Sequence, residues 1–469
     1  MPPRIAIIGG GIAGLSAAWE LRPPAERGAI EVELFEASDR LGGTIHTDRG
    51  LGGILEWGPD SFLARKPEAA TLARELGLEP SFLPVHRGGS YLYLKGKYVP
   101  FPPVGPTGLP RDLPSLMRSP ILSPMGKLRA AGDLLLPRSR EVRSGKDVSV
   151  GDFLGRRLGR AVVDRLAGPV AGGTHLTDID QLSVRSVYPE LLRLEEQHRS
   201  LILGLRAEAR LHRPARAGSP APSPFLTLKG GLETLIEALE KQLSPVLLRK
   251  NAPVDALAPR PEGGYLLRQA GSLHPFDATI IAVPAPGALA MLSPAFEGLR
   301  TVLARVTYAP TMVVGLAFRE VWDRPPFDRA GIMLPQGTSS ILAGVSFPTR
   351  KWGYEVPGGG TSVRAYVNKH RYPVLAKSSD AEIVAQVLPA LRSMLGISEE
   401  PIYTRVFRHP AAMPEYRVGH GELVTRIRDA AARYPRLALA GALYEGVGIS
   451  DCIRSGRAAA RRARDALGP

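Results

Sequence analysis

The residues that follow the N-terminus constrain the fold of this chain more than any other feature. The apolar run Arg4–Ile8 predicts a short buried strand, and Leu15–Leu21 predicts a helix. Between them lies G-x-G-x-x-G, formed by Gly9, Gly11 and Gly14. The first glycine permits a tight turn, the second lets backbone approach a pyrophosphate, and the third lets the helix pack closely on the strand. This order predicts the first half of a dinucleotide-binding βαβ unit.

A second strand with an acidic end completes that unit. Glu31–Glu36 alternates in the manner of a strand, and Glu36 lies 22 residues after Gly14. A carboxylate at this place accepts a hydrogen bond from a ribose 2′-hydroxyl and repels a 2′-phosphate. The residues alone therefore predict FAD or NAD as the cofactor, and they exclude NADP.

Composition excludes several protein classes. The chain has 469 residues, 44% of them hydrophobic and 22% charged, which fits a globular protein of two to three structural units. Cys452 is the only cysteine, so an internal disulfide and a thiolate-rich metal site are excluded. No cluster of histidine ligands stands out, and we expect no metal. The net charge of +15 favours anionic partners without choosing among nucleic acid, a membrane surface and acidic small molecules.

Four further segments resemble known flavoproteins. Glu36–Thr44 has the E-x-x-x-R-x-G-G-x pattern of the superfamily that contains amine oxidases, carotenoid desaturases and porphyrinogen oxidases. Glu56–Phe62 resembles the E-x-G-P-N-S-F segment of protoporphyrinogen oxidases, and Gln197–Gly204 is similar to an H-R-S-L-I-L-G stretch of bacterial members. Gly441–Gly456 resembles their C-terminal G-x-x-x-x-G-V-x-x-x-D-C-I-x-S-G signature. The resemblance to porphyrinogen oxidases spans nearly the whole chain and implies FAD as the cofactor.

The resemblance also implies a set of site residues. Those expected at the cofactor are Gly9, Gly11, Ile12, Ala13, Gly14, Glu36, Ala37, Arg40, Gly42, Gly43, Thr44, Gly58, Pro59, Asp60, Ser61, Val254, Ala442, Val447, Gly448 and Ile449. Arg40 is expected to pair with the phosphates, and residues 447–449 to meet the flavin through backbone at a helix N-terminus. Those expected at the substrate are Gly173, His175, Leu316 and Val345. Met413–Tyr416, with Gly419 and His420, resembles a family segment near the flavin ring.

Asp60 is the single candidate for a catalytic residue, because many relatives have asparagine there. An ionisable carboxyl near the flavin predicts a pH dependence that asparagine would lack. Other departures fall where substrate is expected. Ser90 replaces a basic residue that often precedes the aromatic at this place, and Gly173–Asp178 differs from the usual G-x-Y-A-G-D.

The predicted fold class is α/β. We expect a Rossmann-type FAD-binding domain from discontinuous segments 1–87, 227–300 and 401–469, and an α+β substrate-binding domain from 88–110 and 301–400. Residues 111–226 are expected to form an inserted helical, membrane-facing domain with a mobile loop at 214–224, which is rich in Pro, Ala and Ser. Apolar and basic residues alternate between Leu113 and Arg143, as in elements that bind an anionic membrane surface.

The implied reaction is oxidation of protoporphyrinogen IX to protoporphyrin IX with O2 as acceptor, in heme biosynthesis. Coproporphyrinogen III oxidation is the alternative, which Gln197–Gly204 keeps open and the basic net charge favours. A flavin amine oxidase and a non-catalytic porphyrin carrier are further alternatives. The implied partners are a porphyrinogen and O2, without nucleic acid. The location is expected to be cytoplasmic, either free or peripheral on the membrane, and a homodimer is left open.

Overall fold

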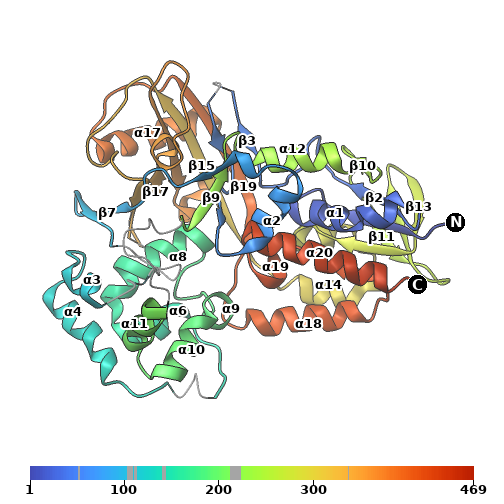
Figure 1. Cartoon of the computed structure of the whole chain (residues 1–469), viewed down its shortest axis with the longest axis horizontal. Coiled ribbons are helices and arrows are strands. Elements are labelled where there is room, and N and C mark those ends of the chain that lie inside the picture. The colour runs from blue at the N-terminus through green and yellow to red at the C-terminus, as the bar shows by residue number, and fades with distance from the viewer. Residues whose placement is uncertain are drawn as a thin grey trace.

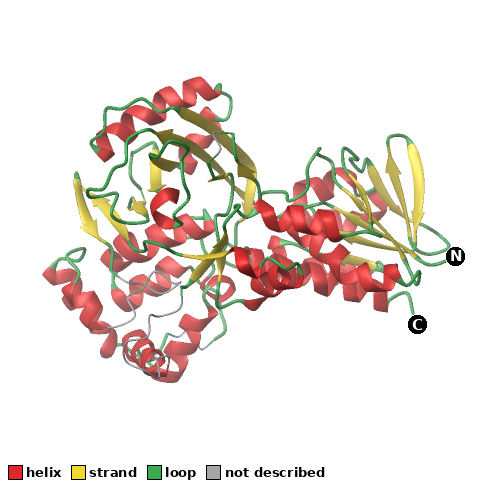
Figure 2. Cartoon of the chain, turned by 45° about the horizontal axis from the view of Figure 1, so that its top comes forward, coloured by secondary structure: helices red, strands yellow, loops and turns green. Residues whose placement is uncertain are grey.

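The computed structural model describes residues 1–50, 53–102, 109, 113–139, 144–211, 223–335 and 337–468. Figure 1 shows an elongated molecule with the N- and C-termini at the same end. A parallel sheet and its helices occupy that end, and a second large sheet and a group of helices occupy the other. Figure 2 shows the same separation from another side.

The sheet near the termini has five parallel strands from three distant stretches of chain. Their order is β10 (Leu247–Arg249), β2 (Glu31–Phe35), β1 (Arg4–Ile8), β14 (Ala278–Ile281) and β20 (Leu437–Leu439). The central strand β1 is buried along Ile5, Ala6 and Ile7, because elements cover both faces of the sheet. This sheet confirms the predicted α/β class and its discontinuous origin.

One face of this sheet packs against α1 (Ile12–Glu26), α2 (Pro67–Glu75), α12 (Glu233–Gln242) and α20 (Ile449–Asp465). Helices α1 and α20 approach closely, since a Cβ atom on Gly456 would lie 2.0 Å from the Ala13 carbonyl oxygen. The other face packs against β11 (Ala256–Pro259), β12 (Tyr265–Gln269), β13 (Ser272–Phe276), α13 (Ala285–Met291), α14 (Glu297–Leu303) and α18 (His420–Ala432).

The second large sheet has seven strands. Their order is β19 (Tyr403–Pro414), β15 (Tyr308–Phe318), β18 (Thr361–Val367), β17 (Leu342–Ser346), β16 (Gly331–Met333), β7 (Ser90–Leu94) and β8 (Lys97–Pro100). Only the pair β16–β7 is parallel, and α17 (Asp380–Leu395) packs on one face. Strand β19 pairs with β15 along its length, so the domain boundary predicted at residue 401 is wrong by one strand. The remaining domain limits stay a proposal.

Helices dominate the described residues between 113 and 211, the helical segment that follows β8. They are α3 (Leu113–Arg118), α4 (Pro124–Ala131), α6 (Val150–Leu158), α7 (Arg160–Val162), a π-helix (Val163–Ala167), α8 (Gly168–His175), α9 (Val184–Val187), α10 (Pro189–His198) and α11 (Leu201–Leu211). They share their own apolar core, and the fully buried Arg157 is ion-paired there with Asp133 and Glu195. Residues 214–222 of the predicted mobile loop lie outside the described residues.

Small elements connect these parts. They are β3 (Thr47–Asp48), β4 (Leu55–Glu56), β5 (Phe62–Leu63), β6 (Phe82–Pro84), β9 (Phe225–Leu228), α15 (Pro348–Lys351), α16 (Tyr372–Leu375), α19 (Ala442–Glu445) and 3-10 turns at Glu79–Ser81, Gly132–Leu134, Pro294–Phe296 and Lys369–Arg371. Within the described part of the chain, we find no helix that combines the length and the apolar character needed to cross a membrane.

Candidate active site

The glycine-rich loop lies between β1 and α1, as predicted. Gly9 has φ +110°, and its N–H donates to the Phe35 carbonyl at 2.8 Å, which joins the loop to the end of β2. A Cβ atom on Gly14 would lie 1.9 Å from the Gly9 carbonyl oxygen, whereas one on Gly11 would meet nothing within 4 Å. Gly14 is therefore required for packing, and Gly11 faces open space at the start of a helix. Ile12 and Ala13 form the first turn of that helix.

Glu36 lies beside this loop at the end of β2. Its carboxylate accepts hydrogen bonds from the Gly10 N–H at 2.8 Å and from the Ser38 N–H at 2.9 Å. The Glu36 carbonyl accepts from the Ala252 N–H at 2.8 Å, which brings the segment that contains Val254 alongside. The structure thus brings together the glycine-rich loop, Glu36 and the segment that contains Val254, which lie far apart in sequence.

The Leu41–Ile45 turn covers the other side of the loop. The Gly42 N–H donates to the Gly10 carbonyl at 2.8 Å, and Gly43 approaches Gly11. The guanidinium of Arg40 donates to the carbonyls of Leu41, Gly43 and Ile45. Arg40 therefore organises this turn in the structure, and its predicted pairing with phosphates stays a prediction, as do the roles of Ala37 and Thr44.

The segment Gly58–Ser61 lies against that turn. A Cβ atom on Gly58 would be 2.3 Å from the Thr44 carbonyl oxygen, which explains the glycine. Pro59 follows, and the Ser61 hydroxyl donates to Asp60 at 2.9 Å. The Gly58 carbonyl accepts from Arg364 at 2.6 Å, so the seven-stranded sheet holds this segment.

Asp60 is a buried ion-pair partner. Its carboxylate is 2.8 Å from the Lys351 ammonium and 3.4 Å from the Arg364 guanidinium. Burial alone would raise the pKa of Asp60, but these two cations hold the pKa well below its usual value. These contacts favour an ionised carboxylate that holds its two cations, and a pH dependence of catalysis through Asp60 stays a prediction.

The turn between α19 and α20 lies at the N-terminus of α20. Gly441 and Gly446 have φ values of +126° and +137°, and Ala442 begins α19 between them. The Gly448 N–H donates to the buried Asp451 carboxylate at 3.3 Å, and Lys66 pairs with the same carboxylate at 2.5 Å. Asp451 thus holds the backbone of residues 447–449 in place. This backbone lies at the N-terminus of α20, where the helix dipole favours negative charge.

Residues 12–464 match the model of the flavin-containing amine oxidoreductases. The chain belongs to this family. It is 35% identical over 464 residues to coproporphyrinogen III oxidase of Bacillus subtilis (strain 168), which covers 97% of this chain and 96% of the relative. It is 32% identical over 497 residues to protoporphyrinogen oxidase of Bos taurus, which covers 98% of both. Within the family, the chain is therefore an FAD-dependent enzyme of the porphyrinogen oxidase group.

Solved structures agree with this assignment at the level of the fold. A crystal structure from Exiguobacterium sp. 255-15 has a TM-score of 0.85 and 29% identity, and the match covers 100% of both chains. Reduced UDP-galactopyranose mutase has a TM-score of 0.71 at 16% identity, and shares the fold alone.

The residues present in this family member fit FAD. Gly11 leaves space at the N-terminus of α1, and the Glu36 carboxylate, the predicted ribose ligand, lies beside that space. Near Gly58, the buried Nε atoms of Trp57 and Arg364 have no hydrogen-bond partner within the described protein. A polar group bound there would give these atoms a partner.

Leu316 and Val345 do not line a substrate site. Both side chains are buried, at 0% and 3% exposure, in the core that the seven-stranded sheet shares with α17. Successive residues of a strand face opposite sides of the sheet. The neighbours Gly315 and Ser346 lie on the face that carries Arg364, where Gly315 approaches Leu55 and the Ser346 hydroxyl meets Tyr366 at 3.3 Å.

The other two substrate predictions lie in α8. Gly173 is exposed, with open space around its Cα, and His175 is half-buried with its ring edge-on to Tyr188. Burial and, to a smaller extent, the charge of Lys66 lower the pKa of His175 to about 4, so its imidazole is neutral at neutral pH. Contact with substrate stays a prediction for both residues.

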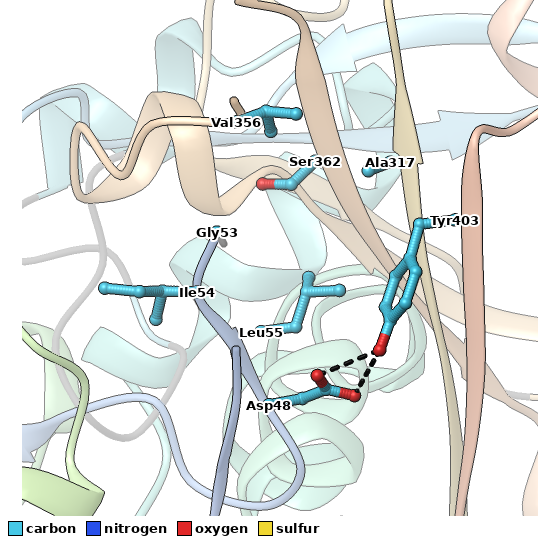
Figure 3. A pocket seen from close by; sticks show the side chains of 8 residues that line it. All are labelled: Asp48, Gly53, Ile54, Leu55, Ala317, Val356, Ser362 and Tyr403. Atoms are coloured by element: carbon cyan, nitrogen blue, oxygen red, sulfur yellow. Dashed lines mark hydrogen bonds between the residues drawn. The ribbon is translucent and has the colours of Figure 1, made fainter. Parts of the chain in front are cut away.

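A small cavity lies away from these residues, between β3, β4 and the seven-stranded sheet. Figure 3 shows Tyr403 donating to Asp48 at one end and Val356 at the other. Its volume of about 10 Å³ has room for one water molecule at most. It is therefore not a substrate site.

Lys351 and Arg364 were not predicted from the sequence as partners of the Gly58–Asp60 segment. The sequence did contain one signal for Arg364. It is a charged residue among apolar ones inside the strand Thr361–Val367, which indicates a buried charge that needs a partner. Among the described residues, no three His, Cys, Asp or Glu side chains are grouped so that they could hold a metal ion.

Proposed function

We propose that this enzyme oxidises coproporphyrinogen III to coproporphyrin III. The resemblance seen in the sequence implies protoporphyrinogen IX, whereas the comparisons favour the alternative substrate. The observation that carries the proposal is the full-length similarity to enzymes named coproporphyrinogen III oxidase, at 35% identity in both Bacillus subtilis and Staphylococcus aureus. The relative named for protoporphyrinogen, from Bos taurus, is 32% identical.

Electrostatics supports this choice. Coproporphyrinogen III has two propionates where protoporphyrinogen IX has vinyl groups, so it is the more anionic substrate. The chain has a net charge of +15, which attracts anions and raises their rate of encounter.

The reaction removes six electrons and six protons from the macrocycle, and three O2 accept them to give three H2O2. Bound FAD supplies the two-electron acceptor for each round. The chain binds the pyrophosphate at residues 9–14 and the ribose at Glu36. The backbone of residues 447–449, at the N-terminus of α20, would lie against the flavin, where the helix dipole and the amides of Val447 and Ile449 favour negative charge, since the Gly448 N–H already donates to Asp451. Because Asp60 is paired with Lys351 and Arg364, it orients its segment.

A direct assay tests the proposal. The purified yellow enzyme is given each porphyrinogen separately, and O2 uptake and porphyrin fluorescence are followed together. We expect kcat/KM to be at least tenfold higher with coproporphyrinogen III. Equal values or a preference for protoporphyrinogen IX would contradict the substrate assignment. Fluorescence without O2 uptake above the enzyme-free rate would favour a carrier, and turnover of primary amines alone would favour an amine oxidase.

We further propose that the helical segment binds an anionic lipid surface. Met125, Leu128 and Leu135 are 72%, 67% and 84% exposed, and the basic residues Arg118, Lys127 and Arg138 lie on the same short stretch. Exposed apolar side chains beside basic ones bind the interface of anionic membranes, with about 1 kcal/mol from each basic residue. Arg140 and Arg143, which belong to the same prediction, lie outside the described residues.

Vesicle flotation tests this proposal. We expect the protein to float with anionic vesicles at low salt and to dissociate as salt rises. Leu135→Asp, or joint reversal of Arg138, Arg140 and Arg143 to glutamate, should reduce flotation at least tenfold. Leu273→Asp is the matched control, because Leu273 is 60% exposed on the distant β13. Wild-type protein that stays in the soluble fraction at low salt would contradict membrane binding and would favour the free cytoplasmic location.

A further inference from the structure

Tyr416 is a buried phenol whose hydroxyl bridges the two ends of α19, the short helix before the α19–α20 turn. The hydroxyl donates to the Ala442 carbonyl at 2.5 Å and accepts from the Gly446 N–H at 2.8 Å. These two groups lie at the start of α19 and just after its end, so one oxygen holds both ends of this short helix, which leads into the α19–α20 turn. With one donor and one acceptor bond made to backbone, the phenol is engaged in holding protein rather than meeting a substrate.

His420 reinforces the same turn. Its ring stacks on Tyr416, with centroids 3.8 Å apart and planes at 18°. Its Nε2 is 3.0 Å from the Leu443 carbonyl, which can only accept, so Nε2 is the protonated nitrogen. Burial lowers the pKa of His420 to about 4, and the ring is therefore neutral under ordinary conditions. Three backbone groups of the turn thus depend on this pair of rings.

Residues of the helical segment hold Tyr416 and His420 in place through hydrogen bonds to the backbone around them. The Tyr416 carbonyl accepts from the Ser183 N–H at 2.8 Å, and the Asp147 carboxylate accepts from the Gly419 N–H at 2.8 Å and from the Ser183 hydroxyl at 2.7 Å. Tyr416 itself packs in the apolar core of the helical segment. A continuous set of contacts therefore runs from that segment, through Tyr416, to the backbone before α20.

We propose that Tyr416 is a positioning residue for the cofactor. It fixes the amides of residues 447–449 against the flavin, with His420 as its support, and it ties their position to the helical segment. Asp451, which is paired with Lys66, holds the Gly448 N–H. Tyr416 holds the Gly446 N–H, two residues earlier. The inference rests on the proposed function, because it places the flavin at the N-terminus of α20.

The predicted signature is electrochemical. A displaced set of amides stabilises the reduced, more negative flavin less than before, while the oxidised flavin is little affected. For Tyr416→Phe we expect retained FAD and about tenfold weaker binding of the reduced form relative to the oxidised form. For a two-electron couple this is a fall of about 30 mV in midpoint potential. We also expect a shift in the visible flavin spectrum.

The experiment compares matched phenols in the holoenzyme, without substrate. Tyr265→Phe removes another buried hydroxyl, which lies on β12 and donates to the Pro435 carbonyl at 2.7 Å. We expect it to lose similar stability with an unchanged potential and spectrum. If Tyr416→Phe also leaves both unchanged, Tyr416 is merely structural and the proposal is overturned.

A second pair of variants covers a failure to fold. His420→Leu removes the donor to Leu443, and His420→Gln keeps an N–H group that can replace it. We expect the potential to fall in His420→Leu and to be restored at least in part in His420→Gln. Equal, wild-type potentials in both would overturn the proposal. Because no porphyrinogen is present, these results do not depend on which substrate is used.

Discussion

Replacing Gly11 by valine is expected to yield a folded protein that purifies without flavin. Gly11 has φ −69° and ψ 174°, an extended conformation that valine adopts readily. A side chain there meets no protein atom within 4 Å, so the fold has room for it. The same space is where the second glycine of the motif admits a pyrophosphate. The measurement is the flavin absorbance per protein, together with the Tm of the apo form.

Gly14→Ala is the matched control. Its new Cβ atom would lie 1.9 Å from the Gly9 carbonyl oxygen, so α1 must move away from the loop. We expect this variant to lose Tm in the apo form as well as flavin, whereas Gly11→Val keeps the wild-type apo Tm. Full flavin absorbance in purified Gly11→Val would show that the cofactor does not lie over this loop.

Replacing Glu56 by glutamine is expected to make the protein more stable than wild type at neutral and alkaline pH. Glu56 is 2% exposed, and its carboxyl accepts from the Leu232 N–H at 2.7 Å and from the Thr47 hydroxyl at 2.9 Å. Burial raises its pKa to about 7, against a usual value of 4.5, although these two hydrogen bonds and then the charge of Arg364 partly oppose the shift. Asp60 adds a further, smaller increase.

The sign follows from the two pKa values. Below pH 4.5 the carboxyl is protonated in the folded and in the unfolded chain, and it imposes no penalty. As pH rises to about 7, the unfolded chain gains by ionising and the folded chain does not, so the stability of the wild type falls. The difference between the two pKa values corresponds to about 3 kcal/mol. Glutamine has no such dependence, and its advantage should grow over this interval and then remain constant.

Urea unfolding of both proteins between pH 4.5 and 8.5 measures this effect. Glu33→Gln is a control with the opposite sign. Burial alone would raise the pKa of Glu33, but Arg249 and Arg4 lower it below its usual value, so its ionised form stabilises the fold. That variant should therefore be less stable than wild type at neutral pH. A difference between wild type and Glu56→Gln that does not change with pH would contradict the assignment to Glu56.

The cofactor half of the site could be predicted because its determinants are local. The turn is defined within a few residues of chain by Gly9, Gly11 and Gly14. Its conformation can therefore be predicted from the residues of the turn alone. The alternation of a strand is equally local, and the strand predicted at Arg4–Ile8 has the bounds of β1. The parallel sheet followed from such elements.

Prediction of the substrate-binding residues depends on which face of the seven-stranded sheet a helix covers. Leu316 and Val345 were expected at the substrate, yet in β15 and β17 their side chains face α17 rather than the side that carries Arg364. A shift of one residue along a strand moves a side chain to the other face. The pattern of the strand alone does not tell which face receives the helix.

Sequence by itself determined the dinucleotide loop, the acidic end of β2 and the family. Only the tertiary structure decided what each charged group does. Asp60 meets Lys351 and Arg364, which lie about 300 residues further along the chain, and those two cations lower the pKa of its carboxyl. Backbone turns are set by neighbours in sequence, whereas a pKa is set by neighbours in space, which the chain acquires only when it folds.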